Sequence, residues 1–178
     1  MAAQRLQDLM NTLPQQGTLE WIGLRPGRDE PMLAPESATI ERGQGLIGDR
    51  FRGRPESKRQ VTLIQAEHLP VIASLVHQDA ITPDRLRRNL VVRGLNLLAL
   101  KGKRFRVGEA VLEMTGLCDP CSKMEAELGP GGYNAMRGHG GITTRVIEGG
   151  EIRLGDVIEV LASDRAPVQT SFDDLTTG

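Results

Sequence analysis

Apolar residues along this chain recur mostly at alternate positions or in short runs, and glycine or proline separates one run from the next. Such runs predict β-strands, because successive side chains of a strand point to opposite faces of the sheet. The predicted strands lie at 18–24, 38–42, 60–64, 89–92, 104–107, 110–114, 142–147, 151–154 and 156–161. Many short strands joined by glycine turns favour a mainly β fold, a distorted β-barrel rather than a parallel sheet.

Apolar residues at helical spacing are confined to a few short segments. Within residues 1–13 they predict a peripheral amphipathic helix that ends before Pro14, because proline cannot continue a helix. Other short helices are expected at 65–76, 82–88 and 122–128. A chain of 178 residues supports one sizeable core rather than two domains. We therefore expect an N-terminal cap segment at 1–16, one β-barrel domain at 17–162 and a flexible tail at 163–178.

The composition argues against several classes of protein. Charged residues make up 25% of the chain and the net charge is -1, without the basic excess of a nucleic-acid-binding protein. Residues 85–106 contain eight Lys or Arg and no carboxylate, but only Phe105 could stack on bases. No apolar run is long enough for a signal peptide or a membrane span. We expect a soluble, cytoplasmic protein with neither a nucleic-acid nor a membrane partner.

Both cysteines lie in residues 116–121, directly after a predicted strand. Cysteines three positions apart can form a redox pair, half of a metal site, or one nucleophilic thiolate beside a helper. A thioredoxin-like pair belongs in a βαβ unit, and the pattern predicts none. A structural zinc site needs two more ligands, but His68, His77 and His139 show no paired spacing, so zinc is not expected.

A series of short motifs extends along most of the chain. They are Gly48-Asp49-Arg50, Arg59-Gln60-Val61, Arg88-Asn89 followed by Gly94, the Gly108 turn, Asp119-Pro120-Cys121, and Gly140-Gly141 through Arg145-Val146 to Gly155-Asp156. In this order, over residues 18–161, they resemble the MOSC domain, a module named after the C-terminal part of molybdenum cofactor sulfurases. The resemblance implies a stand-alone domain with a β-barrel of the kind also found in a pyruvate kinase domain. One departure is Phe51, where histidine is frequent in the family.

The resemblance also implies roles for particular residues. Cys121 matches the family cysteine that ligates molybdenum in relatives with the cofactor, and that has also been proposed to carry sulfur as a persulfide. Because the pterin of molybdenum cofactor bears a phosphate, Arg88 with Asn89, then Arg50 and Arg145, are the predicted cofactor-binding residues. For each arginine the alternative is a solvated face or an ion pair.

Some neighbouring residues are candidates for accessory roles. Cys118 either resolves a persulfide as a disulfide or is a small apolar residue near the site. His139, which lies between glycines, either donates a proton to a substrate or is incidental to a glycine turn. Asp49 and Asp156 each follow a glycine and are interpreted as turn formers that accept hydrogen bonds from backbone N–H groups.

Three functions are compatible with the sequence. The first is a small molybdenum-dependent reductase component that acts on N-hydroxylated or other N–O compounds, with electrons from a separate protein. No G-x-G-x-x-G follows a strand and opens a helix, so neither NAD nor flavin is expected. The second is a sulfur carrier with a persulfide on Cys121. No pyridoxal-phosphate-dependent, aminotransferase-like half is present, so another protein would donate the sulfur, and the carrier would pass it to an acceptor. The third is a non-catalytic interaction module.

Overall fold

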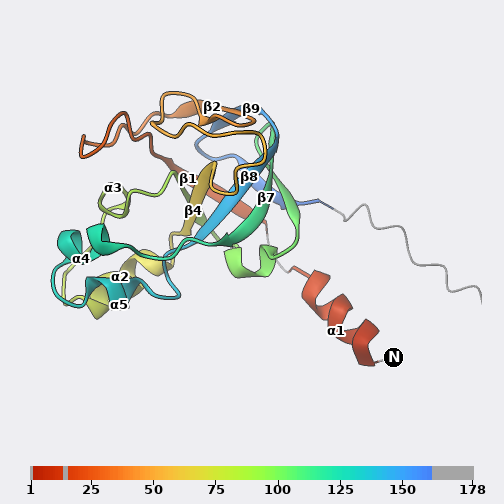
Figure 1. The fold of residues 1–178 in the computed structure, drawn as a ribbon. Coiled ribbons are helices and arrows are strands. Elements are labelled where there is room, and N and C mark those ends of the chain that lie inside the picture. The colour runs from red at the N-terminus through yellow and green to blue at the C-terminus, as the bar shows by residue number, and fades with distance from the viewer. Residues whose placement is uncertain (1, 14–15, 162–178) are drawn as a thin grey trace, which may run out of the picture.

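The computed structural model describes residues 2–13 and 16–161. Within these ranges, seven strands close into a barrel, and the prediction of a mainly β, barrel-like fold is confirmed (Figure 1). In the order in which they pair, the strands are β1 (Gly17–Ile22), β10 (Val157–Val160), β6 (Arg104–Val107), β7 (Ala110–Leu117), β8 (Ile142–Glu148), β4 (Val61–Gln65) and β5 (Leu90–Arg93). Neighbouring strands are antiparallel except β4 and β5, which run parallel.

A second sheet lies beside the barrel and consists of β3 (Gly45–Leu46), β2 (Ser37–Glu41) and β9 (Gly150–Arg153). The predicted strands at 38–42 and 151–154 are found here as β2 and β9, outside the barrel. Residues 45–46 form a strand, although the glycines around them predict a loop. Because Ile40 and Leu46 are buried in the barrel core, this sheet closes over the barrel.

Two of the helices follow from the parallel pairing of β4 and β5, since parallel neighbours need a crossover connection. The helical elements are α1 (Ala2–Asn11), α2 (His68–Leu75), α3 (Pro83–Leu86), the 3-10 helix η1 (Leu97–Leu100), α4 (Ser122–Leu128) and α5 (Gly132–Met136). The crossover contains α2 and α3. Figure 1 shows both on the same side of the barrel as α4 and α5.

Strands β4 and β5 are buried on both faces. Leu63 and Leu90 point into the barrel core, whereas Ile64 and Val91 pack in a second apolar cluster with Leu86 and other residues of the helices. Two-sided burial explains why the predicted strand at 60–64 is a continuous apolar run rather than an alternation. The helices are therefore fixed against the barrel wall.

Helix α1 is found where the sequence predicts a cap, and it projects from the barrel (Figure 1). Its apolar side chains Leu6, Leu9 and Met10 are exposed, and Lys103 Nζ donates a hydrogen bond to Asn11 Oδ1 at 2.6 Å. The predicted tail lies outside the described residues. None of the helices in the described part of the chain is long and apolar enough to cross a membrane.

Candidate functional site

A pocket of about 490 Å³ opens where the loop after β7 meets the loops that lead into β4 and out of α3. Its lining consists of Arg25, Arg50, Phe51, Arg59, Thr62, Leu86, Arg87, Arg88, Cys118, Asp119, Pro120, Cys121, Lys123 and Met124. Six of these side chains are Lys or Arg, whereas Asp119 is the only carboxylate in this lining. Such a concentration of positive charge in a concave site attracts anions.

Both cysteines line the pocket, but they differ in accessibility. Cys121 is exposed and immediately precedes α4, while Cys118 is 3% exposed. The Cys118 Sγ accepts a hydrogen bond from Arg59 Nη2 at 3.7 Å. Of the two thiols, Cys121 is therefore the one that a bound molecule can reach, and Cys118 lies beneath Arg59.

Arg88 and Asn89 are held by protein groups. The Arg88 side chain is 7% exposed and donates hydrogen bonds to the carbonyl oxygens of Leu86, Cys118 and Gly140. Asn89 is 1% exposed; its Oδ1 accepts from the backbone N–H of Thr62, and it lies outside the pocket lining. Cofactor contact by these residues stays a prediction, but their hydrogen bonds in the structure join segments of the fold.

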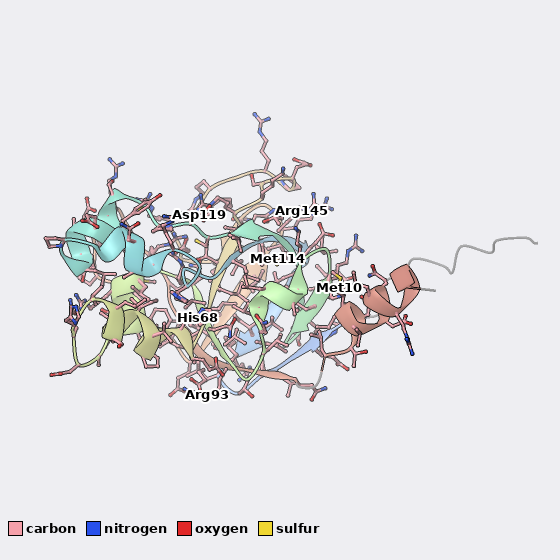
Figure 2. All side chains as sticks on the ribbon, turned by 90° about the horizontal axis from the view of Figure 1, so that it is seen from below. Met10, His68, Arg93, Met114, Asp119 and Arg145 are labelled. Atoms are coloured by element: carbon pink, nitrogen blue, oxygen red, sulfur yellow. The ribbon has the colours of Figure 1, made fainter. Side chains whose placement is uncertain are left out.

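The other two predicted arginines lie in different places. Arg50 lines the pocket, and no hydrogen bond or ion pair of its side chain is found within residues 2–13 and 16–161. Arg145 lies on β8 and forms an ion pair with Glu113 of the neighbouring strand β7. Figure 2 shows Arg145 well apart from Asp119 of the pocket, so the structure does not bring it to the cysteines.

Several pocket cations were not singled out by the sequence. Arg25, Arg59, Arg87 and Lys123 come from four separate parts of the chain and converge only in the fold. Arg59 opens one of the motifs and Arg87 precedes another, and this adjacency is the only sequence signal that could have identified them. Alternation and charge runs do not distinguish Arg59 from nearby Arg54, which is not among the pocket-lining residues.

Asp49 lies behind the pocket lining and binds two of its residues, Arg25 and Phe51. It is 1% exposed, and its carboxylate accepts hydrogen bonds from Arg25 at Nε (3.0 Å) and Nη2 (2.7 Å) and from the backbone N–H groups of Arg25 (2.7 Å) and Phe51 (3.0 Å). Burial alone would raise the pKa of Asp49, but the hydrogen bonds and charge of Arg25 outweigh it and hold the pKa below its ordinary value. The predicted role of Asp49 as an acceptor for backbone N–H groups is confirmed.

His139 is not among the pocket-lining residues and lies edge-to-face against His68 of α2, with ring centroids 5.1 Å apart. The Nδ1 atoms of both rings are buried without a partner in the described part of the chain. Burial and the neighbouring His139 lower the pKa of His68. The pair therefore packs most favourably when His68 is neutral.

The pH dependence of stability tests this packing. Because the fold disfavours protonated His68, the stability that the neutral histidine contributes is fully present above the ordinary histidine pKa of about 6.5. This contribution declines as the pH falls below that value. Between about pH 7.5 and about pH 5.5 the melting temperature of His68→Phe should fall less than that of the wild type, by roughly 2 °C. Exposed His77 provides the control variant His77→Asn, which should behave as the wild type does. Equal falls in melting temperature for all three proteins would contradict the conclusion that His68 is packed in its neutral form.

Solved structures with a similar fold include three bacterial proteins. The YuaD protein from Bacillus subtilis matches with a TM-score of 0.71 and 22% sequence identity, over 84% of this chain and 98% of its own. YiiM from Escherichia coli matches with a TM-score of 0.65 and 20% identity, over 84% of this chain and 71% of its own. YiiM from Geobacillus stearothermophilus matches with a TM-score of 0.63 and 15% identity, over 82% of this chain and 75% of its own. At these identities the likeness shows the fold alone.

No curated protein matches the sequence. A family model described as the MOSC domain matches residues 43–159. The matched region begins just before β3 and ends within β10, and it includes both cysteines and Arg50, Arg59 and Arg88 of the pocket. The match covers most of the barrel together with the helices that pack on β4 and β5. This chain belongs to the MOSC domain family.

Proposed function

We propose that this protein binds molybdenum cofactor, with the Cys121 thiolate as a metal ligand. The MOSC domain family is known for binding this cofactor. The observation that carries the proposal is that one pocket combines an accessible thiol with a surplus of cations. A thiolate is a soft ligand suited to a redox-active metal, and guanidinium groups suit a phosphate. The pocket volume of about 490 Å³ also lies in the range usual for small-molecule sites.

The phosphate would bind at Arg50 and Arg59, because most other pocket cations already have acceptors. Arg25 is paired with Asp49, and Lys123 with Asp29 at 2.6 Å. The Arg87 and Arg88 guanidinium groups donate to backbone carbonyl oxygens. Arg50 has no side-chain acceptor within the described ranges, and the Arg59 side chain makes one hydrogen bond there, to the Cys118 sulfur.

The reaction that we propose is reduction of N-hydroxylated or related N–O compounds, with electrons supplied by a separate donor protein. The bound cofactor would supply two-electron redox chemistry at the metal. Cleavage of an N–O bond to an amine and water consumes protons, and the lining includes Asp119, the carboxylate next to Pro120 and Cys121. Asp119 would pass protons from solvent to the departing oxygen.

A sulfur carrier is the second candidate, favoured by the position of Cys118 and Cys121 in one pocket. The Cys118 thiol would then attack the inner sulfur of a Cys121 persulfide, which forms the Cys118–Cys121 disulfide and releases the outer sulfur as hydrogen sulfide. Protein isolated from a molybdenum-replete host distinguishes the two functions. Cofactor binding predicts near-stoichiometric molybdenum and a pterin that is released on denaturation. The carrier predicts no metal and an intact mass increased by one sulfur atom, which reduction removes.

The phosphate assignment makes a separate prediction. Arg50→Gln and Arg59→Gln should each weaken pterin retention by about tenfold or more, since a hydrogen bond to a charged group contributes about 1.5–3 kcal/mol. Pterin that remains with the protein after gel filtration at increasing salt is the measurement. Arg54→Gln, on the same loop but outside the pocket lining, is the control. Equal retention by all three variants would place the phosphate elsewhere.

A further inference from the structure

We propose that Arg88 is a positioning residue, which fixes the loop that carries Cys118 and Cys121 instead of contacting the ligand. Sequence alone suggests the opposite, because an arginine in a family motif beside a cofactor pocket is an obvious phosphate ligand. Three features of the structure favour positioning: the acceptors of the guanidinium, the close contact of two loops, and an unpaired buried charge.

The guanidinium of Arg88 joins three segments that are far apart in the sequence. Its Nη1 donates to Leu86 O at the end of α3 (2.9 Å), its Nη2 to Cys118 O after β7 (3.2 Å), and its Nε to Gly140 O before β8 (2.7 Å). Each of the three nitrogens donates one hydrogen bond to the protein and the side chain is 7% exposed, so little of the guanidinium is accessible from the pocket. Only the planar fork of arginine can reach three such acceptors at once, since lysine offers a single ammonium group.

The two loops that Arg88 joins are also in direct contact. The Cys118 N–H donates to Gly141 O at 2.9 Å. A Cβ atom added to Gly140 would lie 2.3 Å from Cys118 O and 3.2 Å from Arg88 Nη2. No side chain fits there, so glycine at 140 and arginine at 88 are parts of one arrangement that determines where the backbone of Cys118 lies. Cys121 is three residues further on and immediately precedes α4, so its position depends on the same arrangement.

The charge of Arg88 also supports a positioning role. No carboxylate pairs with it within residues 2–13 and 16–161, and its acceptors are neutral carbonyl groups. Burial lowers the pKa of Arg88, while Cys118 and Cys121 act in the opposite direction. A buried guanidinium without an ion-pair partner leaves positive charge behind the thiols, which favours an anionic occupant of the pocket. Arg88 thus assists binding through position and field, without touching the ligand.

The test compares the alkylation rates of the two cysteines by iodoacetamide, followed by peptide mass mapping of the apo protein. In the wild type, exposed Cys121 should react at least about tenfold faster than buried Cys118. In Arg88→Met the loops separate, so the ratio of the two rates should fall by about tenfold, toward parity. Arg88→Lys, which keeps the charge but not the three donors, should give an intermediate ratio.

A matched control is available three residues earlier in the chain, on α3. Arg85 also joins separate segments, through Glu127 at 2.7 Å and Gln78 at 2.7 Å, but it lies outside the pocket lining. Arg85→Met should therefore keep the wild-type ratio even if its melting temperature falls. A general loss of stability cannot produce this difference between the two arginines.

Two other results would overturn the positioning role of Arg88. A folded Arg88→Met with the wild-type ratio overturns the proposal. If that variant does not fold, Gly140→Ala disturbs the same contact from the other loop while retaining Arg88; a wild-type ratio in both Gly140→Ala and Arg88→Lys likewise overturns it. The inference relies on the proposed function only for the identity of the ligand. Absence of molybdenum from the wild type would refute that function and leave the alkylation result intact.

Discussion

Replacement of Asp49 by asparagine is expected to cost the folded protein about 3 kcal/mol, because it removes the anionic partner of a largely buried ion pair. Asp49 is 1% exposed and receives three side-chain and two backbone hydrogen bonds, from Arg25, Phe51 and Asn89. An asparagine amide has one acceptor oxygen and no charge, so Arg25 loses its counterion. The Arg25 side chain is 21% exposed and can be partly rehydrated, which places the cost at the lower end of the usual range of about 3–5 kcal/mol.

The same contacts make the stability of the protein depend on pH in the acid range. The pKa of Asp49 is lower in the fold than in the unfolded chain, so its stabilisation is present above about pH 4 and is lost as the pH falls through the folded-state pKa. Urea unfolding, followed by the fluorescence of Trp21, measures both effects. Asp49→Asn should show a smaller loss of stability than the wild type below about pH 4.

Asp156 supplies the control, because it also follows a glycine and accepts one backbone hydrogen bond, from Arg153 at 2.7 Å. It has no ion-pair partner among the described residues, so Asp156→Asn should cost no more than about 1 kcal/mol. Equal unfolding midpoints for Asp49→Asn and Asp156→Asn would refute the ion-pair account of the pocket wall.

The barrel was predictable from the sequence because alternation and short apolar runs report how each strand is buried. They do not report which strands pair. β2 pairs with β9, more than a hundred residues away, so its membership of a second sheet depends on contacts that the local pattern does not contain. The prediction therefore identified these strands but not their place outside the barrel.

Helix α5 was missed for a different reason. The glycines at 129–132 predict the end of a helix, yet a new helix begins at Gly132. The carboxylate of Glu125, on α4, accepts hydrogen bonds from the backbone N–H groups of Gly131 (2.9 Å) and Tyr133 (2.7 Å). A side chain of the preceding helix thus satisfies the backbone at the start of α5, and no residue type within 129–132 signals this.

For the site, the sequence identified the segment with the cysteines but not the surroundings that separate their roles. The burial of Cys118 depends on Arg59 and on the loop at 138–141, both remote in the sequence. Arg88 is an informative case, since a motif indicates that an arginine matters without indicating whether it faces a ligand or backbone carbonyl groups. Only the fold shows its three acceptors.

Cys121→Ser is expected to lower the molybdenum content by at least about tenfold. A serine hydroxyl is a harder and much weaker ligand than a thiolate, so the metal loses its soft protein ligand while the cation-rich pocket remains. Cys118→Ser is the matched control, because it makes the same change three residues away, at a side chain that is 3% exposed and lies under Arg59. It should retain most of the metal.

The most direct test of cofactor binding through Cys121 is therefore the molybdenum-to-protein ratio of the wild type, Cys121→Ser and Cys118→Ser. The three proteins are isolated in parallel from a molybdenum-replete host, and elemental analysis is accompanied by circular dichroism to establish that each is folded. The account predicts near-stoichiometric metal in the wild type, most of it in Cys118→Ser and almost none in Cys121→Ser. A folded Cys121→Ser with the wild-type ratio, or a folded wild type without molybdenum, would contradict it.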